Sequence, residues 1–243
     1  MTQKKTTMKK IVYAAIILFF LFPLTGTALG WHDNTHLAVA KAAKYPMWYN
    51  AAAPDIAKIK AGNIEYFNHW YNNNGESAVT AETVTKQISR YNKTNDSSDA
   101  EGHLYGAIVA ALRAYEQYLN SGKYAEYHIV YCAHYIGDLT MPLHNTPYDD
   151  YNKNRHQAND GIVDQVVLEH PENIERHMYK INLRDDHFEA DLIREIARIA
   201  NISHLLGYKL RAENRDMTAD EAYIQLGNSA SLLQAVLQHY KKL

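Results

Sequence analysis

Three side chains that can bind a metal ion follow one another closely in the middle of the chain. His134 and Asp138 are four residues apart, so on a helix their side chains lie on one face, one turn apart. Pro142 cannot continue a helix interior, so the chain turns there and His144 arrives from another direction. Two imidazoles and one carboxylate that point toward a common position form part of the ligand set of a zinc site. A single pair of this kind is more often a structural histidine beside a helix-end acid.

Two further pairs of histidine and aspartate lie elsewhere in the chain. Asp55 and His69 are fourteen residues apart, and His156 and Asp160 repeat the four-residue spacing. Each pair has an ordinary structural explanation, since an acid such as Asp55 in the first turn of a helix is favoured by the helix dipole. Together with His36 and the central group, these pairs supply five histidines and three carboxylates. That combination predicts a site for several metal ions.

The first thirty residues have the composition of a secretory signal peptide. Four lysines precede an apolar run over residues 11–24, and residues 25–30 are small or weakly polar and end in Ala-Leu-Gly. The apolar run is too short to span a membrane comfortably, so we expect cleavage rather than a stable membrane anchor. The protein would then be secreted or periplasmic. Trp31 would become the first residue, with a free amine and a carbonyl that can chelate a metal five residues before His36.

Residues 31–243 are long enough for one domain with a sizeable core. Without the four lysines of the leader, 21 basic residues stand against 27 acidic ones, a net charge of −6. This acidic balance does not provide the basic surface needed for general DNA or RNA binding, but it permits a small anionic substrate held by metal ions. Cys132 is the only cysteine, so an intrachain disulfide is excluded. We interpret it as a buried hydrophobic residue.

Nearly every long segment after residue 30 has a helical pattern, and no segment shows the alternation of a strand. We therefore predict an all-α fold, a single compact multi-helix domain. The polar residues 146–159 are expected to form a loop, and a helix is expected to begin near Asp160. The other expected helices cover residues 37–44 (capped by Asn34 or Thr35), residues following Pro54, and residues 77–91, 99–119, 125–139, 187–210 and 218–241.

The most specific block in the chain is His134-Tyr-x-Gly-Asp138-Leu-x-x-Pro142-x-His144. In this block, and in the order of tryptophan, histidines and aspartates from Trp31 to Asp160, the chain resembles the zinc-dependent phospholipase C / P1-S1 nuclease superfamily. The resemblance covers the expected mature chain from Trp31 to at least Asp164. It implies an all-α domain of the phospholipase C/P1 nuclease type with three zinc ions and a ligand tryptophan at the mature N-terminus.

The resemblance also implies a role for each candidate residue. One zinc ion would be held by Asp55, His69, His134 and Asp138. A second would be held by the amine and carbonyl of Trp31 and by His36, and bridged to the first by Asp138. The third would be held by His144, His156 and Asp160. Asp55 would in addition orient or deprotonate the attacking water.

The activity that the resemblance implies is phosphodiester hydrolysis by a zinc-activated hydroxide. The wording of the central block and the short gap from His144 to His156 resemble the phospholipase branch, which favours a phospholipase C acting on glycerophospholipids at a membrane surface. The short spacing from Trp31 to His36 and the aspartate at 160 resemble the nuclease branch, so a single-strand nuclease/3′-nucleotidase is the first alternative. A non-catalytic, zinc-binding helical protein is the second. No protein partner is inferred.

Overall fold

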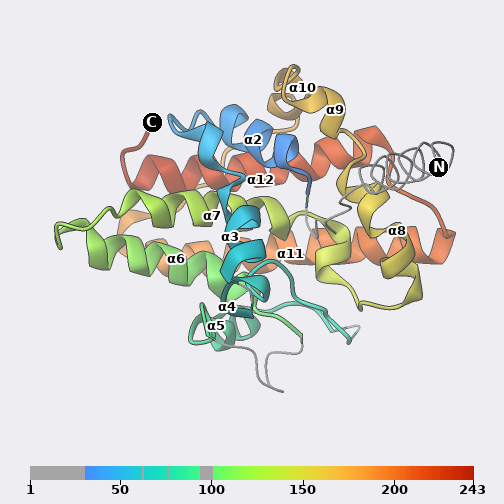
Figure 1. Ribbon diagram of the computed structural model, residues 1–243, viewed down its shortest axis with the longest axis horizontal. Coiled ribbons are helices and arrows are strands. Elements are labelled where there is room, and N and C mark those ends of the chain that lie inside the picture. Colours follow the sequence, from blue (N-terminus) through green and yellow to red (C-terminus); the bar gives the residue numbers. More distant parts are fainter. Residues whose placement is uncertain (1–30, 62, 76, 94–100) are drawn as a thin grey trace, which may run out of the picture.

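The computed structural model describes residues 31–61, 63–75, 77–93 and 101–243 of the chain, and these residues form helices joined by loops (Figure 1). Their only β-type pairing is an isolated antiparallel bridge between Tyr71 and Gly102. The predicted all-α fold in a single compact domain is confirmed. The predicted signal peptide lies outside the described residues. Within the described part, no helix combines the length and the apolar character needed to cross a membrane.

The elements follow the chain in a simple order. The α-helices and 3-10 helices of the described part are α2 (Asp33–Ala42), η1 (Trp48–Asn50), α3 (Ala53–Ala61), α4 (Asn63–Tyr66), α5 (Ala81–Ile88), α6 (Leu104–Leu119), α7 (Glu126–Leu139), η3 (Pro142–Asn145), α8 (Asp150–Asp160), α9 (Asp164–Val167), α10 (Glu172–Glu175), η4 (Asp185–His187), α11 (Phe188–Glu213) and α12 (Ala219–His239).

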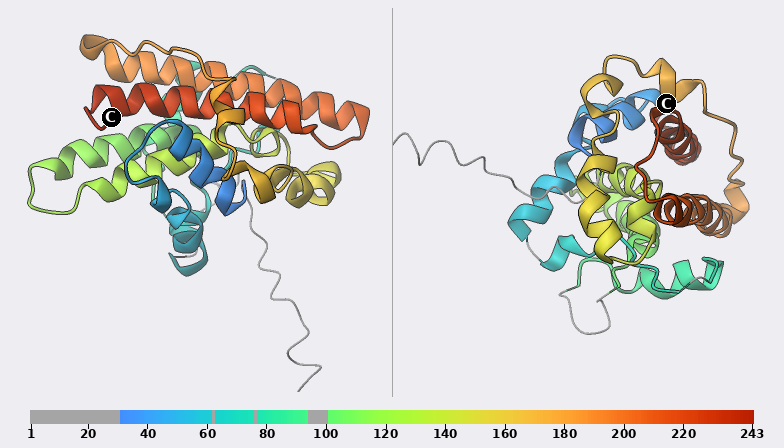
Figure 2. Two further views of the ribbon diagram at one scale, coloured as in Figure 1. Left: turned by 90° about the horizontal axis from the view of Figure 1, so that it is seen from above. Right: turned by 90° about the vertical axis from the view of Figure 1, so that its right-hand side faces the viewer.

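Helix α7 is the central element of the fold. It packs against α6 and also contacts α2, α3, α11 and α12. Seen from above in Figure 2, it lies between the long C-terminal helices α11 and α12 on one side and the blue and cyan segments with α2 and α3 on the other. Its residues from Ile129 to Leu139 are buried, and Ile129, Ile136 and Leu139 have no exposed surface. Burial on all sides from Ile129 onward explains why this part of α7 is apolar around most of its circumference, apart from His134 and Asp138 near its C-terminal end.

Several predicted helix ends are confirmed by local chemistry. Thr218 caps α12 in a capping box with Glu221, as the sequence predicted. Gly122 has a positive φ just after α6, where the sequence predicted a stop. Pro142 ends the run of α7 and begins η3. Cys132 is buried, as expected.

Other helix boundaries differ from the predictions. Helix α2 already begins at Asp33, because Asn34 and Thr35 do not cap it but bind the carboxylate of Asp164. Helix α6 begins only at Leu104, since Gly102 with φ of 76° turns the chain just before it. Helix α5 is shorter than predicted and is capped by Thr80.

The largest correction concerns residues 146–159, which were predicted to be a loop. Most of them form α8, whose N-cap Asp149 accepts a hydrogen bond from the backbone N–H of Asn152. Capping and side-chain contacts at its ends stabilise this very polar helix, so it needs no apolar face. The helix expected near Asp160 is correspondingly displaced: α8 ends at that residue, and the next helix, α9, begins at Asp164.

Candidate metal centre

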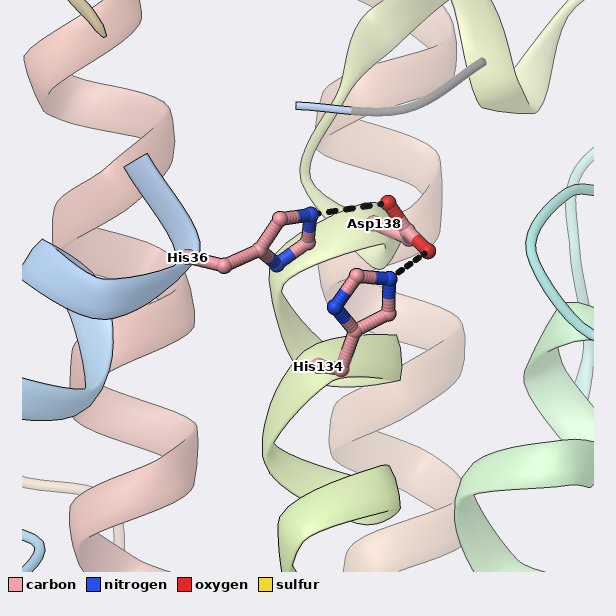
Figure 3. A group of neighbouring side chains, drawn as sticks. All are labelled: His36, His134 and Asp138. Carbon is pink, nitrogen blue, oxygen red and sulfur yellow. Dashed lines mark ion pairs between the residues drawn. The ribbon is translucent and has the colours of Figure 1, made fainter. Parts of the chain in front are cut away.

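The C-terminal end of α7 carries the two residues around which the candidate site is built. His134 and Asp138 lie on one face of α7, one turn apart, as the spacing predicted (Figure 3). His36 comes from α2 and Asp55 from the first turn of α3. The remaining candidates are His69 after α4, His144 in η3, and His156 and Asp160 in α8.

Asp138 is the centre of this group. Its Oδ2 lies 2.9 Å from Nδ1 of His69 and 3.2 Å from Nε2 of His134. Its Oδ1 lies 3.4 Å from Nε2 of His36 and 3.5 Å from Nδ1 of His144. One buried carboxylate therefore faces four imidazoles from four separate segments of the chain.

The possible ligand atoms fall into three groups, and within each group they lie within 4.8 Å of one another. Each group consists of histidine nitrogens and carboxylate oxygens, the donors that zinc prefers. The groups are His36 with His134 and Asp138, Asp55 with His69 and His134, and His144 with His156 and Asp160. The structure thus brings together the eight predicted histidine and aspartate ligands, and these buried groups could bind metal ions.

Hydrogen bonds on the outer side of the rings determine which nitrogen faces the site. Nδ1 of His134 lies 2.8 Å from the carbonyl oxygen of Ala51, and Nδ1 of His156 lies 2.6 Å from Oδ1 of Asn152. Both partners only accept hydrogen bonds, so each Nδ1 carries a proton and each neutral ring presents the lone pair of Nε2 to the site. This is the usual arrangement of a metal-ligating histidine.

The Nε2 atom of His134 faces two carboxylates and a second imidazole, that of His69, whose Nδ1 lies 3.1 Å away. Besides Oδ2 of Asp138 at 3.2 Å, it lies 3.6 Å from Oδ1 of Asp55. A lone pair that faces two carboxylates is unfavourable unless a proton or a cation lies between them. Similarly, Nε2 of His144 and Nε2 of His156 are only 3.2 Å apart, with Asp160 beside them.

Buried polar atoms without hydrogen bonds also fit a metal. Within the described residues, both ring nitrogens of His36, Oδ1 of Asp138 and Nδ1 of His144 have no hydrogen-bond partner, although all three residues are buried. Leaving such atoms unsatisfied is costly, and coordination to a metal ion removes the cost. The donor set and the unsatisfied atoms together fit zinc.

The charges of the site perturb its pKa values in both directions. Burial opposes ionisation of Asp138 and Asp55, but the neighbouring His134 outweighs it, so the pKa of Asp138 is well below the usual range and that of Asp55 is about 2. Burial likewise opposes protonation of His134, but Asp55 and Asp138 outweigh it and raise its pKa to about 9. Burial lowers the pKa of His144 to about 4. Without metal, the strongest proton-binding position in the cluster is therefore His134.

Three supporting residues were missed by the sequence analysis. Lys58 is buried in α3 and donates a hydrogen bond to Oδ1 of Asp55 at 2.7 Å. Glu65 is buried with its Oε1 3.5 Å from Nε2 of His69, the nitrogen that points away from Asp138. Asn152 orients His156. The spacings of three and four residues were visible in the sequence, but burial of the lysine and the glutamate was not.

Trp31, the predicted N-terminal ligand, is buried at the edge of the described chain. The backbone N–H of the next residue, His32, bonds to the carbonyl oxygen of Asp160 at 3.4 Å, which ties the start of the domain to the end of α8. Gly161 leaves room for the ring of His32 beside it. These contacts hold the segment before α2 close to the site, while ligation by Trp31 itself stays a prediction.

A small aromatic pocket adjoins two of the candidate ligands. It has a volume of about 80 Å³ and is walled by aromatic side chains and by His144 and His156. The aromatic members are Tyr66, Phe67, Trp70 and Tyr148. Their π-faces suit either a quaternary ammonium group or a stacked nucleobase.

Comparisons of this chain with protein-family models, with curated proteins and with solved structures found no match. The interpretation of the site therefore depends on its own residues and geometry, together with the motif resemblance.

Proposed function

We propose that this protein is an exported, zinc-dependent phosphodiester hydrolase with up to three zinc ions, and that its preferred substrate is a glycerophospholipid, which it cleaves as a phospholipase C. The observation that carries the proposal is the position of Nε2 of His134, which faces the carboxylates of Asp138 and Asp55 and requires a proton or a cation between them. A divalent cation satisfies all three groups at once.

Each part of the cluster would hold one ion. Asp55, His69, His134 and Asp138 would hold the first, His36 with the amine and carbonyl of Trp31 would share Asp138 for the second, and His144, His156 and Asp160 would hold the third. When bound, zinc would polarise a phosphoryl oxygen and lower the pKa of water from about 15.7 toward 7. Ligands from so many separate segments suit a catalytic centre better than a storage site.

The residues of the chain would position the reactants. Asp55, with a pKa of about 2, is ionised at neutral pH and is a weak base, so it would orient the attacking water rather than remove its proton. Lys58, bonded to Asp55, would hold that carboxylate in place and bring a positive charge close to the phosphate of the substrate. The aromatic pocket beside His144 would receive the group next to the scissile bond.

A single-strand nuclease is the second candidate, and the aromatic pocket favours it as well because bases stack on aromatic faces. We favour the phospholipid because the pocket is lined by aromatic side chains that suit a choline group and because α3 exposes apolar side chains beside the site.

The paired substrate assay tests the proposal. Zinc-loaded protein is incubated side by side with phosphatidylcholine vesicles and with single-stranded DNA. Release of phosphorylated head group with intact DNA supports phospholipase C. Cleavage of DNA with intact lipid supports a single-strand nuclease instead of a phospholipase C. No turnover on either substrate at full zinc content identifies a non-catalytic zinc protein.

A further inference from the structure

Helix α3 and the start of α4 expose large aliphatic side chains. Ile56 is 62% exposed, Ile59 is 74% exposed and Ile64 is 45% exposed. These isoleucines follow one another at roughly helical spacing in the sequence, and the structure leaves their side chains exposed to solvent. Together with the exposed Lys60 they form a patch on a segment that projects away from the long C-terminal helices (Figure 2, left).

The same helix carries two buried residues of the candidate site. Asp55 and Lys58 face the histidines, while Ile56 and Ile59 in the same two turns face solvent. Because an α-helix with its side chains is about 10 Å across, the patch lies about one helix diameter from the site. The segment that continues from the patch also supplies Tyr66, Phe67 and Trp70 to the aromatic pocket.

We propose that this patch, defined by Ile56, Ile59, Lys60 and Ile64, docks the protein on the surface of a phospholipid bilayer. Its composition supports this occupant, because exposed aliphatic side chains next to a lysine are typical of helices that lie in a membrane interface. The exposed residues of α3 include no acid, although the whole chain has a net charge of −2. A positive and apolar patch on an acidic protein complements an anionic lipid surface.

A second protein is a poorer occupant. Three partly exposed side chains cannot supply the roughly 800 Å² that each partner contributes to a stable interface. The patch also lacks the aromatic and arginine residues that anchor such interfaces. For a bilayer, a few aliphatic side chains are enough to hold the molecule reversibly at the lipid surface.

This inference rests on the proposed function as far as the substrate is concerned, so binding is measured apart from hydrolysis. Zinc-loaded protein is floated with vesicles of equal parts phosphatidylcholine and phosphatidylglycerol. We compare wild type with the double variant Ile56→Gln/Ile59→Gln. Glutamine is a good helix former, so α3 should stay intact in this variant. The matched control is Leu205→Gln, which changes a 69%-exposed leucine on the long C-terminal helix α11.

The double variant is expected to bind vesicles about a hundredfold more weakly, about tenfold for each isoleucine. It should keep its zinc and its activity on a short-chain phospholipid below the micelle concentration, and the control should bind like wild type. Equal binding of both variants, or no binding of the wild type, overturns the proposal. The proposal is also overturned if the wild type is a dimer and the double variant is a monomer, because the patch would then be a dimer interface.

The two proposals can fail separately. If wild-type protein floats with vesicles and the isoleucine variant does not, but the lipid stays intact, the membrane patch is supported and the phospholipase activity is refuted. If the protein cleaves soluble phospholipid but does not float with vesicles, the phospholipase activity is supported and the membrane patch is refuted.

Discussion

The imidazole of His36 lies flat on that of His134, with the ring centroids 3.7 Å apart and the planes inclined by 17°. Two stacked imidazoles this close cannot both be cations at modest cost. Burial and the charge of His134 accordingly lower the pKa of His36. At neutral pH, His36 is therefore neutral and has a lone pair available, next to a position that binds a proton or a cation.

Gly137 makes the position of His36 possible. A Cβ atom at this residue would lie 2.5 Å from Nδ1 of His36. We expect Gly137→Ala to displace the imidazole and to lower the zinc content from three ions to two, as measured by elemental analysis. The control is Gly227→Ala in α12, where a Cβ would meet Cβ of His177 at 2.6 Å. The control should lose stability but keep its zinc, and equal zinc content in both variants would refute the role of Gly137.

Asn152 is expected to control the affinity of the third zinc position. Its Oδ1 accepts the hydrogen bond from Nδ1 of His156, and its Nδ2 donates to the carbonyl oxygen of Leu143 at 2.7 Å. Removing such an orienting partner usually weakens metal binding about tenfold to a hundredfold. Titration of metal-free Asn152→Ala with zinc should show this loss for one ion while the other two bind normally. A uniform loss at all three positions would indicate general unfolding instead.

Lys58 is expected to affect turnover but not metal content. It touches Asp55, which would be a ligand, but offers no lone pair to a metal when protonated. We expect Lys58→Gln to lower kcat/KM for a phosphodiester about tenfold to a hundredfold, the usual range for a lost charged hydrogen bond, at full zinc content. Lys60→Gln, on the exposed side of the same helix, is the control and should keep wild-type activity on a soluble substrate. Loss of zinc from Lys58→Gln would contradict this role.

The stability of the metal-free protein should fall as the pH rises, whereas its affinity for zinc should increase. The pKa of His134 is about 9 in the folded protein and about 6.5 in an unfolded chain. Its contribution to stability, on the order of 3 kcal/mol, is complete below about pH 6.5 and is lost as the pH rises through about 9. Zinc must displace this proton, so zinc affinity should rise about tenfold per pH unit up to about pH 9.

Two series of measurements check this prediction. Urea unfolding of the metal-free protein should give a lower free energy of unfolding at pH 9 than at pH 6.5, and competition with a chromophoric chelator should give zinc affinities that increase over the same range. A zinc affinity independent of pH would show that His134 holds no proton to displace.

The sequence predicted residues that share one face of a helix and some of the helix ends. The spacing of His134 and Asp138 placed both on one face of α7, and the pairing of Thr218 with Glu221 marked the start of α12. The prediction failed for α8, because a helix that is stabilised by its cap and by polar contacts has no apolar periodicity to detect.

The convergence of distant segments followed from the motif resemblance and not from periodicity. Nothing local to Asp55 or His69 indicates that they meet α7, and the burial of Lys58 and Glu65 depends on how α3 and α4 dock on the rest of the fold. The exposure of Ile56 and Ile59 could not be predicted either, since helical spacing alone does not determine which face of α3 packs against the rest of the fold.

Elemental analysis of the mature protein, with its N-terminus sequenced to begin at Trp31, tests the zinc cluster most directly when wild type, Asp138→Asn and Asp191→Asn are compared. Asp191 is a buried carboxylate of α11 that binds Arg184 and Arg194 far along the chain from the site. We expect three zinc ions in wild type and in Asp191→Asn, and at most one, with loss of phosphodiester cleavage, in Asp138→Asn. An active Asp138→Asn protein with its full zinc content would contradict this expectation.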